Sequence, residues 1–141
     1  MKVYVIDNGG QWTHREYRVV RDLGHEVKIV PNTTPFEKIA NADALLLSGG
    51  ATRVSYEAQK LGNCREYLEK FSGKILGICA GHQVMAIFYG GKTKAAKVPE
   101  YGLAKIKILE DDPIFTGIPK KEFSVWESHN DEVTEAPGFK I

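Results

Sequence analysis

Residues 74–91 read KILGICAGHQVMAIFYGG, and three structural signals follow one another in this stretch. Lys74–Ile78 is short and has apolar residues at 75, 76 and 78, which predicts a buried strand. Ala80–Tyr89 is apolar over the length of a short helix, and two glycines follow it, as expected where a helix ends. The junction has the pattern G-x-C-x-G, which places a cysteine on a sharp turn from strand to helix.

Cys79 occupies this junction, and the sequence predicts that it is a nucleophile. Its neighbours Gly77 and Gly81 lack side chains, which allows the strand and the helix to pass close together. At the first turn of a helix, unpaired N–H groups and the positive end of the dipole favour the reactive thiolate. The N–H of Ala80 would point to the place where an oxyanion forms. The alternative, a buried structural cysteine, is the role we expect for Cys64, which lies on an apolar helical stripe.

Strands and helices alternate through the first 91 residues. Strands are predicted at Lys2–Ile6, Glu26–Val30, Ala44–Leu47 and Lys74–Ile78, and helices at Gln11–Leu23, from Thr34–Glu37 onward, at Tyr56–Phe71 and at Ala80–Tyr89. The strands are continuously apolar rather than alternating, which indicates an α/β fold with an open, mostly parallel sheet and helices on both faces. Beyond Lys92, alternation at residues 104–108 and 123–126 predicts exposed or edge antiparallel strands.

Length and composition restrict the class of protein. The 141 residues fit a single domain, residues 1–141, and Lys+Arg 19 against Asp+Glu 18 implies no nucleic-acid partner. No apolar run is long enough for a membrane span. The two cysteines fit a reducing, cytoplasmic environment, and neither they nor His82 and His129 have a metal-ligand spacing, so we expect no metal site.

Three further segments are candidates for a site. Ser48-Gly49-Gly50 directly follows a predicted strand, where Gly50 could supply a second oxyanion donor. Residues 125–132, VWESHNDE, are expected to be a polar loop, either functional or merely solvated. The glycines of Asp7–Gln11 lie at a strand–helix junction but lack a phosphate-binding motif, so a nucleotide site there is not expected.

These residues together resemble the class I, or triad-type, glutamine amidotransferases. The resemblance rests on GICAGHQ at 77–83, on the Ser48-Gly49-Gly50 segment and on WESHNDEV at 126–133. The opening DNGGQWTHREYRVVRDLG, VPNTTP at 30–35 and EYGL at 100–103 narrow it to the glutaminase subunits of archaeal-type, two-chain GMP synthases. The resemblance covers essentially the whole chain and implies a flavodoxin-like core.

The resemblance implies a mechanism. Cys79 would attack the side-chain amide of L-glutamine, form a glutamyl thioester and release ammonia, while the N–H groups of Gly50 and Ala80 bind the oxyanion. The implied substrate-binding residues are Gln83, Ser128, His129, Asn130 and Asp131. Ammonia would pass to an ATP-dependent synthetase, an ATP pyrophosphatase subunit that converts XMP to GMP. ATP and Mg²⁺ would belong to that partner, and this chain would bind no cofactor.

The chain departs from the family pattern in two respects. Ala51 follows Gly49-Gly50 where the family usually has proline, which changes the stiffness of the loop but not its N–H groups. The second departure concerns the general base. The family activates its cysteine with a histidine, itself oriented by a glutamate, in an F-H-P-E segment downstream of WESHNDEV. None of the four histidines (His14, His25, His82 and His129) is followed by Pro-Glu. Residues 137–141, PGFKI, read as a turn and the start of another strand. We therefore expect a domain whose C-terminal portion is missing, and little glutaminase activity from this polypeptide alone.

Two alternatives remain open at this stage. The chain could be the glutaminase subunit of another amidotransferase, serving anthranilate or carbamoyl-phosphate synthesis, because the cysteine turn would look the same. It could also be a non-catalytic module that keeps the fold and lacks the general base.

Overall fold

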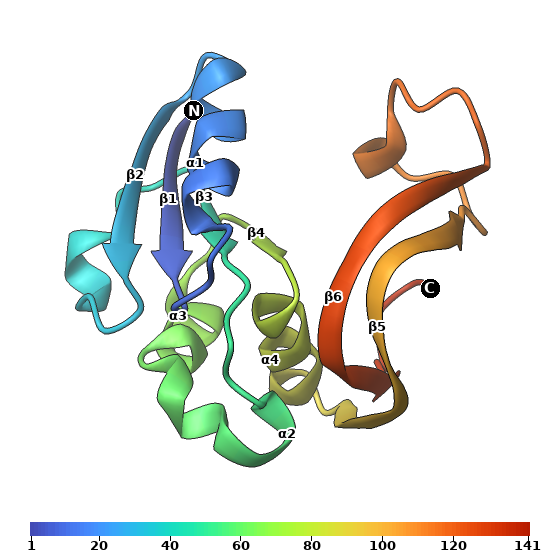
Figure 1. Cartoon of the computed structure of the whole chain (residues 1–141). Coiled ribbons are helices and arrows are strands. Elements are labelled where there is room, and N and C mark those ends of the chain that lie inside the picture. The colour runs from blue at the N-terminus through green and yellow to red at the C-terminus, as the bar shows by residue number, and fades with distance from the viewer.

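The computed structural model describes all residues 1–141 as an α/β body and a long, curved hairpin beside it (Figure 1). The body runs from the N-terminus to the end of helix α4 (Ala80–Phe88). The hairpin consists of β5 (Lys92–Lys107) and β6 (Glu122–Glu135), joined by a segment with a short 3₁₀ helix at Pro113–Phe115.

The body contains a four-stranded parallel sheet in the order β2-β1-β3-β4. The strands are β1 (Lys2–Asp7), β2 (Glu26–Pro31), β3 (Ala44–Leu47) and β4 (Lys74–Gly77). Each predicted strand is present to within one residue at each end, and the predicted fold class is confirmed. The carboxyl ends of β1, β3 and β4 lie side by side at one edge of the sheet, where α/β proteins bind their ligands.

Helices cover both faces of the sheet. Helix α1 (Thr13–Asp22) packs against β1 and β2 on one face. Helices α3 (Cys64–Lys70) and α4 cover the other face, where Ile6 and Leu47 belong to the main core cluster. Cys64 is fully buried in this cluster, as predicted from its position on an apolar stripe.

The prediction of one continuous helix at Tyr56–Phe71 is wrong, because this segment forms three separate elements. The structure has a four-residue helix α2 (Val54–Glu57), a 3₁₀ turn at Ala58–Leu61, and then α3. The break lies at Gly62, whose φ is +54° and where a Cβ would lie 2.6 Å from the backbone oxygen of Asn32. Contact with the segment after β2 therefore overrides the helical periodicity here.

The short helix predicted from Thr34–Glu37 forms only as a 3₁₀ turn at Phe36–Lys38, and Thr34 does not cap it. The backbone oxygen of Thr34 instead accepts hydrogen bonds from the Tyr67 hydroxyl and from the Asn63 side chain, the latter at 3.1 Å. These bonds join α3 to the loop after β2, so the polar groups of this loop serve tertiary packing.

The hairpin differs most from the sequence-based expectation. Its strands are longer than the alternation predicted, and residues 125–132 belong to strand β6 rather than to a polar loop. The pairing shifts between Ala95–Asp131 and Glu100–His129, so that residues 96–99 of β5 stand against Asn130 alone. Such a bulge bends a hairpin, and this one curves beside the body (Figure 1).

The strand expected to start at Phe139–Ile141 is also not observed. Residues 137 and 138 form a turn, and residues 139–141 have no regular secondary structure. The Phe139 ring instead contacts the ring of Tyr89, with 5.4 Å between centroids.

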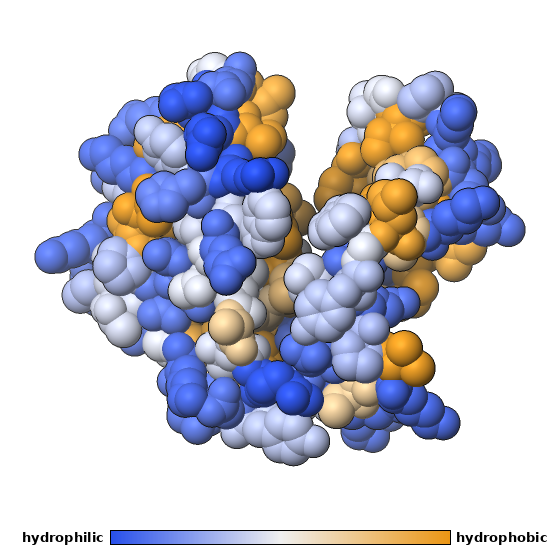
Figure 2. Space-filling view, in the orientation of Figure 1, coloured by the Kyte–Doolittle hydropathy of each residue, from blue (hydrophilic) through white to orange (hydrophobic).

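Apolar surface remains open between the body and the hairpin (Figure 2). On β4 and just after it, Leu76 and Ile78 are partly exposed, and on the hairpin Leu103 and Trp126 are exposed. The outer edge of β4 has no strand partner. None of the helices is both long and apolar enough to cross a membrane.

Candidate active site

Cys79 lies in a strained turn between β4 and α4. Its φ is +49° and its ψ is −110°, and it is the one non-glycine residue with positive φ. A Cβ at Gly77 would lie 2.7 Å from the backbone of Gly81, and one at Gly81 would lie 2.2 Å from the oxygen of Leu47. The flanking glycines are therefore required by the close approach of strand and helix. Backbone strain of this kind persists where the surroundings enforce it, often at functional sites.

Two backbone amides face the thiol of Cys79. The N–H groups of Ala80 and Gly50 interact with the sulfur and act to lower its pKa. These are the two donors that the sequence assigned to the oxyanion hole. Donors that already converge on the nucleophile can also bind an oxygen on the carbon that this nucleophile attacks.

Burial has the opposite effect on the thiol and is larger. It raises the pKa of Cys79 above the ordinary thiol value despite the two amides, and the charges of Glu127 and Glu16 raise it further. The helix start therefore acts in the expected direction, towards the thiolate, but burial outweighs it and the net pKa is raised. A base close to the sulfur would oppose this effect by taking up the thiol proton.

The loop between β1 and α1 supports the oxyanion loop, Ser48–Gly50. Asn8 donates to Ser48 through its backbone N–H (3.0 Å, to Oγ) and its side-chain amide (2.9 Å, to the backbone oxygen). A Cβ at Gly10 would lie 2.5 Å from the oxygen of Gly49, and a Cβ at Gly50 would lie 2.4 Å from the oxygen of Asn8. The glycines after β1 thus allow two loops to pack backbone to backbone.

Glu16 of α1 also contacts this loop. Its Oε1 accepts a long hydrogen bond, 3.5 Å, from the N–H of Gly49, while its Oε2 is buried without a partner. Burial raises the pKa of Glu16, the Gly49 bond partly offsets this, and Asp7 adds to the rise. Sequence reasoning treated the first loop only as a poor nucleotide site and missed its supporting role. The sequence feature that could have indicated this role is the pair of glycines in each loop, Gly9-Gly10 and Gly49-Gly50.

A cavity of about 1050 Å³ opens beside Cys79. The loop after β1, the loop after β3, the cysteine turn and strand β6 line it. Five of the predicted site residues contribute directly to its wall besides Cys79 and Gly50, namely Gln83, Ser128, His129, Asn130 and Asp131. The structure therefore brings together residues that are up to 81 positions apart, from Gly50 to Asp131.

The polar groups of the predicted substrate-binding residues differ in whether they already have hydrogen-bond partners within the protein. Cys79 Sγ lies 3.9 Å from the backbone oxygen of Ser128, so this part of β6 faces the nucleophile. The Gln83 side chain donates to the backbone oxygen of Asp131 at 2.9 Å. The carboxylate of Asp131 is bound by Arg53 and Ser55, so neither of its oxygens is without a protein partner.

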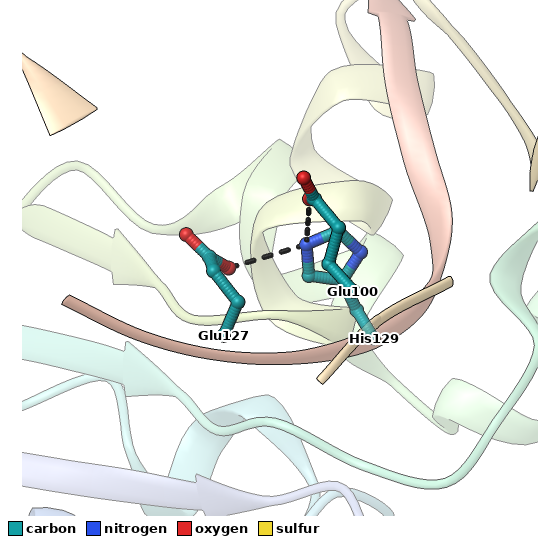
Figure 3. Close-up of side chains that lie close together, drawn as sticks. All are labelled: Glu100, Glu127 and His129. Atoms are coloured by element: carbon teal, nitrogen blue, oxygen red, sulfur yellow. Dashed lines mark ion pairs between the residues drawn. The ribbon is translucent and has the colours of Figure 1, made fainter. Parts of the chain in front are cut away.

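His129 lies between two carboxylates (Figure 3). Its Nε2 is 3.0 Å from Glu100 of β5 and 3.2 Å from Glu127 of β6, while its Nδ1 is buried without a partner. One ligand atom from each of the three residues lies within 4.8 Å of the others, a spacing that a cation could bridge. The ion pairs account for the arrangement. Glu100 and Glu127 were missed by sequence reasoning because only strand pairing brings Glu100 opposite His129.

None of the chain's histidines hydrogen-bonds to Cys79. His82 lines the cavity from α4, and burial, together with His129, lowers its pKa. His129 is held by its two carboxylates. The only hydrogen-bond contact of the Cys79 side chain with another side chain or backbone oxygen is the long one to Ser128.

Comparison with known proteins agrees with this geometry. The family model for class I glutamine amidotransferases matches residues 4–141. The glutamine-hydrolyzing subunit of GMP synthase from Thermoplasma acidophilum is 46% identical over 137 residues, 97% of this chain and 68% of the relative. The corresponding subunit from Picrophilus torridus is 48% identical over 133 residues, 94% of this chain and 70% of the relative.

Solved structures give the same result. The crystal structure of a GMP synthase subunit from Thermoplasma acidophilum superposes with a TM-score of 0.90 at 46% identity, covering 98% of this chain and 69% of that one. A glutamine amidotransferase from Thermotoga maritima, with a TM-score of 0.72 at 20% identity, shares the fold over 97% of this chain and 64% of that one. The chain belongs to the class I glutamine amidotransferase family, among the relatives of the glutamine-hydrolyzing subunits of GMP synthase.

Proposed function

We propose that this chain is the glutaminase subunit of a GMP synthase and supplies ammonia to a separate synthetase chain. The observation that supports this most is Cys79 itself: a strained nucleophile faced by the amides of Gly50 and Ala80 at the wall of a large cavity. The identity of 46–48% with glutamine-hydrolyzing subunits of GMP synthase supports the choice among glutaminases.

The reaction would proceed through a thioester. The sulfur of Cys79 attacks the amide carbon of the glutamine side chain, and the resulting oxyanion is bound by the N–H groups of Gly50 and Ala80. The carbon–nitrogen bond then breaks, and the nitrogen leaves as ammonia after taking up the proton removed from the thiol. Water hydrolyses the glutamyl thioester to glutamate and restores the thiol.

The cavity wall on the β6 side would hold the rest of the substrate. Ser128, His129 and Asn130 line the cavity next to the nucleophile, and Gln83 lies at the start of α4 below them. Polar side-chain and main-chain groups suit the amino and carboxylate groups of L-glutamine.

We also propose that the base which activates Cys79 lies outside these 141 residues, in a C-terminal portion of the same domain. Burial raises the pKa of the Cys79 thiol, an effect that a base would counter, and none of the four histidines hydrogen-bonds to the sulfur. The relatives are longer, since this chain spans 68–70% of the length of the two described above. This polypeptide alone should therefore hydrolyse glutamine far more slowly than a chain of the relatives' full length. Equal turnover would show the proposal to be wrong.

The partner would be an ATP-dependent synthetase that aminates XMP, and ATP and Mg²⁺ would bind there, in a cytoplasmic complex. A candidate docking surface is the basic side of α1, where Arg15, Arg18 and Arg21 lie beside His14. Complementary charge on the partner would speed association.

The test is a pair of assays on the complete chain assembled with its cognate synthetase. Cys79→Ala should reduce glutamine-dependent GMP formation by roughly 10³-fold or more. Ammonia-dependent GMP formation should stay unchanged, because free ammonia bypasses this chain. Loss of both activities would point to a structural defect. The chain could instead be active with glutamine only when it is assembled with the synthetase of another amidotransferase. That result would favour a role in anthranilate or carbamoyl-phosphate synthesis. Unaltered glutamine-dependent activity would favour a non-catalytic module.

A further inference from the structure

The Asp131 side chain accepts three hydrogen bonds at the candidate site. It is 4% exposed, although it lies in the cavity wall. Its Oδ1 accepts from Nε of Arg53 at 2.7 Å. Its Oδ2 accepts from the hydroxyl of Ser55 at 2.6 Å and from the Ser55 backbone N–H at 3.3 Å. Both carboxylate oxygens are therefore engaged by the segment that follows β3.

The backbone of Asp131 makes a further link to the body. Its carbonyl oxygen accepts from Nε2 of Gln83 on α4 at 2.9 Å. Gln83 is itself buried, at 6% exposure, so this bond is shielded from water. Asp131 thus joins strand β6 to two separate elements of the body, the start of α2 and the start of α4.

The hairpin has few other polar links to the body. Apart from the 3.9 Å contact between Cys79 Sγ and the Ser128 oxygen, every side-chain hydrogen bond between the two parts involves Asp131. Other ion pairs of the hairpin strands, such as Lys92–Glu135 and Lys94–Glu132, lie within the hairpin. Asp131 also pairs with Ala95, directly beside the bulge where the pairing of β5 and β6 shifts.

We propose that Asp131 is a positioning residue: with Arg53 and Ser55 it clamps strand β6 onto the body and so fixes the wall at Ser128–Asn130 opposite Cys79. This inference rests on the proposed glutaminase function and changes the role of Asp131, which the family resemblance implied to be a substrate ligand. A displacement of reacting groups by about 1 Å can cost roughly 10²-fold in rate. Asp131 lies on the same strand as Ser128, whose backbone oxygen contacts Cys79. Loss of the bonds to Asp131 should therefore displace the groups opposite Cys79 and slow its reaction with substrate.

The experiment measures the labelling of Cys79 in the full protein by two electrophiles. A chloroketone analogue of glutamine reports on the substrate wall, and iodoacetamide reports on the thiol alone. The variant Asp131→Asn keeps the size of the side chain and removes its charge. The matched control is Glu135→Gln, which breaks the exposed 2.8 Å ion pair with Lys92 on the same hairpin.

We expect Asp131→Asn to slow labelling by the chloroketone about 10-fold or more, because the wall is displaced. Its labelling by iodoacetamide should stay within about 3-fold of the original chain. Ser55→Ala and Arg53→Lys should also slow the labelling of Cys79 by the chloroketone. The double variant Ser55→Ala/Asp131→Asn should cost no more than Asp131→Asn alone, because the three groups act as a unit. Glu135→Gln should react like the original chain.

A different pattern would overturn the proposal. If Asp131→Asn abolishes chloroketone labelling while Ser55→Ala and Arg53→Lys label normally, Asp131 binds the substrate directly. If the original chain reacts with iodoacetamide and not with the chloroketone, the proposed function is wrong. The attachment of β6 by Asp131 is then tested by hydrogen exchange instead. The amides of residues 128–131 should then exchange faster in Asp131→Asn and not in Glu135→Gln. Equal exchange in both variants would show that Asp131 does not hold β6.

Discussion

The sulfur of Cys79 lies 3.9 Å from the backbone oxygen of Ser128, a residue 49 positions later in the chain. This contact places the nucleophile directly against strand β6, so the hairpin forms one wall of the candidate active site. The wall is held by Asp131, three residues further along the same strand. The chemistry at Cys79 therefore depends on how the hairpin is attached to the body.

Labelling of Cys79 should depend on pH in a specific direction. Burial raises the pKa of this thiol, and the amides of Ala80 and Gly50 only partly offset the rise. Because the thiolate is the reactive form, the alkylation rate should still be increasing above pH ~8.5, the ordinary thiol value. Iodoacetamide labelling between pH 6 and 10, followed by mass spectrometry, measures this. A plateau reached by neutral pH would contradict it.

Cys64 supplies the internal control for this measurement. It is fully buried, burial raises its pKa to about 12, and its sulfur lies 3.3 Å from Oδ1 of Asn8. We expect one label per folded chain at pH 8 and two after unfolding in denaturant. Two labels on the folded chain would mean that the core opens on the time scale of the reaction.

Replacing the carboxylates near Cys79 should make the thiol more acidic. After burial, the charges of Glu127 and Glu16 both raise the pKa of Cys79. Removing either negative charge favours the thiolate, so Glu16→Gln and Glu127→Gln should each shift the alkylation profile to lower pH. The Asp22→Asn variant, at the exposed end of α1, should leave the profile unchanged. A shift to higher pH in Glu16→Gln would indicate that Glu16 acts chiefly by holding the Gly49 N–H.

The two glycines of the oxyanion loop should differ in their tolerance of alanine. A Cβ at Gly50 would overlap the backbone oxygen of Asn8 at 2.4 Å, whereas a Cβ at Gly49 would lie 3.4 Å from the Cβ of Cys79. Gly50→Ala must therefore move the loop and its oxyanion donor, and we expect a loss of about 10²-fold or more in glutamine turnover. Gly49→Ala should cost clearly less. Steady-state kinetics of the assembled enzyme tests this, and equal losses would show that the overlap is relieved elsewhere.

The clamp should also appear in the pH dependence of stability. Burial alone would raise the pKa of Asp131, but hydrogen bonds from Ser55 and Arg53 outweigh it and the net pKa is lowered. A carboxyl with a lowered folded-state pKa stabilises the fold above its unfolded value, about 3.9, and loses this contribution as the pH falls through the folded value. At pH 7 we expect Asp131→Asn to lower the free energy of unfolding by roughly 1–3 kcal/mol.

Urea unfolding of the original chain and Asp131→Asn at several pH values measures this contribution. The difference between them should shrink as the pH falls below about 4. Glu135→Gln, which breaks an exposed ion pair, serves as the control and should change stability by less than about 1 kcal/mol at any pH. A difference that stays constant down to pH ~2 would show that the charge of Asp131 is not what stabilises the hairpin.

Periodicity predicted most of the body because burial there follows the local pattern. The continuous apolar runs Val3–Ile6 and Ala44–Leu47 lie in central strands, since a strand covered on both faces needs apolar residues at every position. Prediction failed for Tyr56–Phe71, where Gly62 and Asn63 pack on the loop after β2. A contact between segments about 30 residues apart leaves no periodic signal.

The sequence by itself determined the cysteine turn and the sheet. The glycines around Cys79 can be recognised in the sequence because a Cβ at Gly77 or Gly81 would lie 2.7 Å or less from a neighbouring backbone atom, so only glycine fits there. Tertiary structure alone decided that the strand predicted at 123–126 continues through residues 127–132, that Glu100 meets His129, and that Asp131 binds Arg53 and Ser55. The physical reason is that the partner of a polar side chain depends on strand register and on distant loops. The same charged residue that would be solvated on a free loop becomes a buried anchor when a neighbouring element supplies its donors.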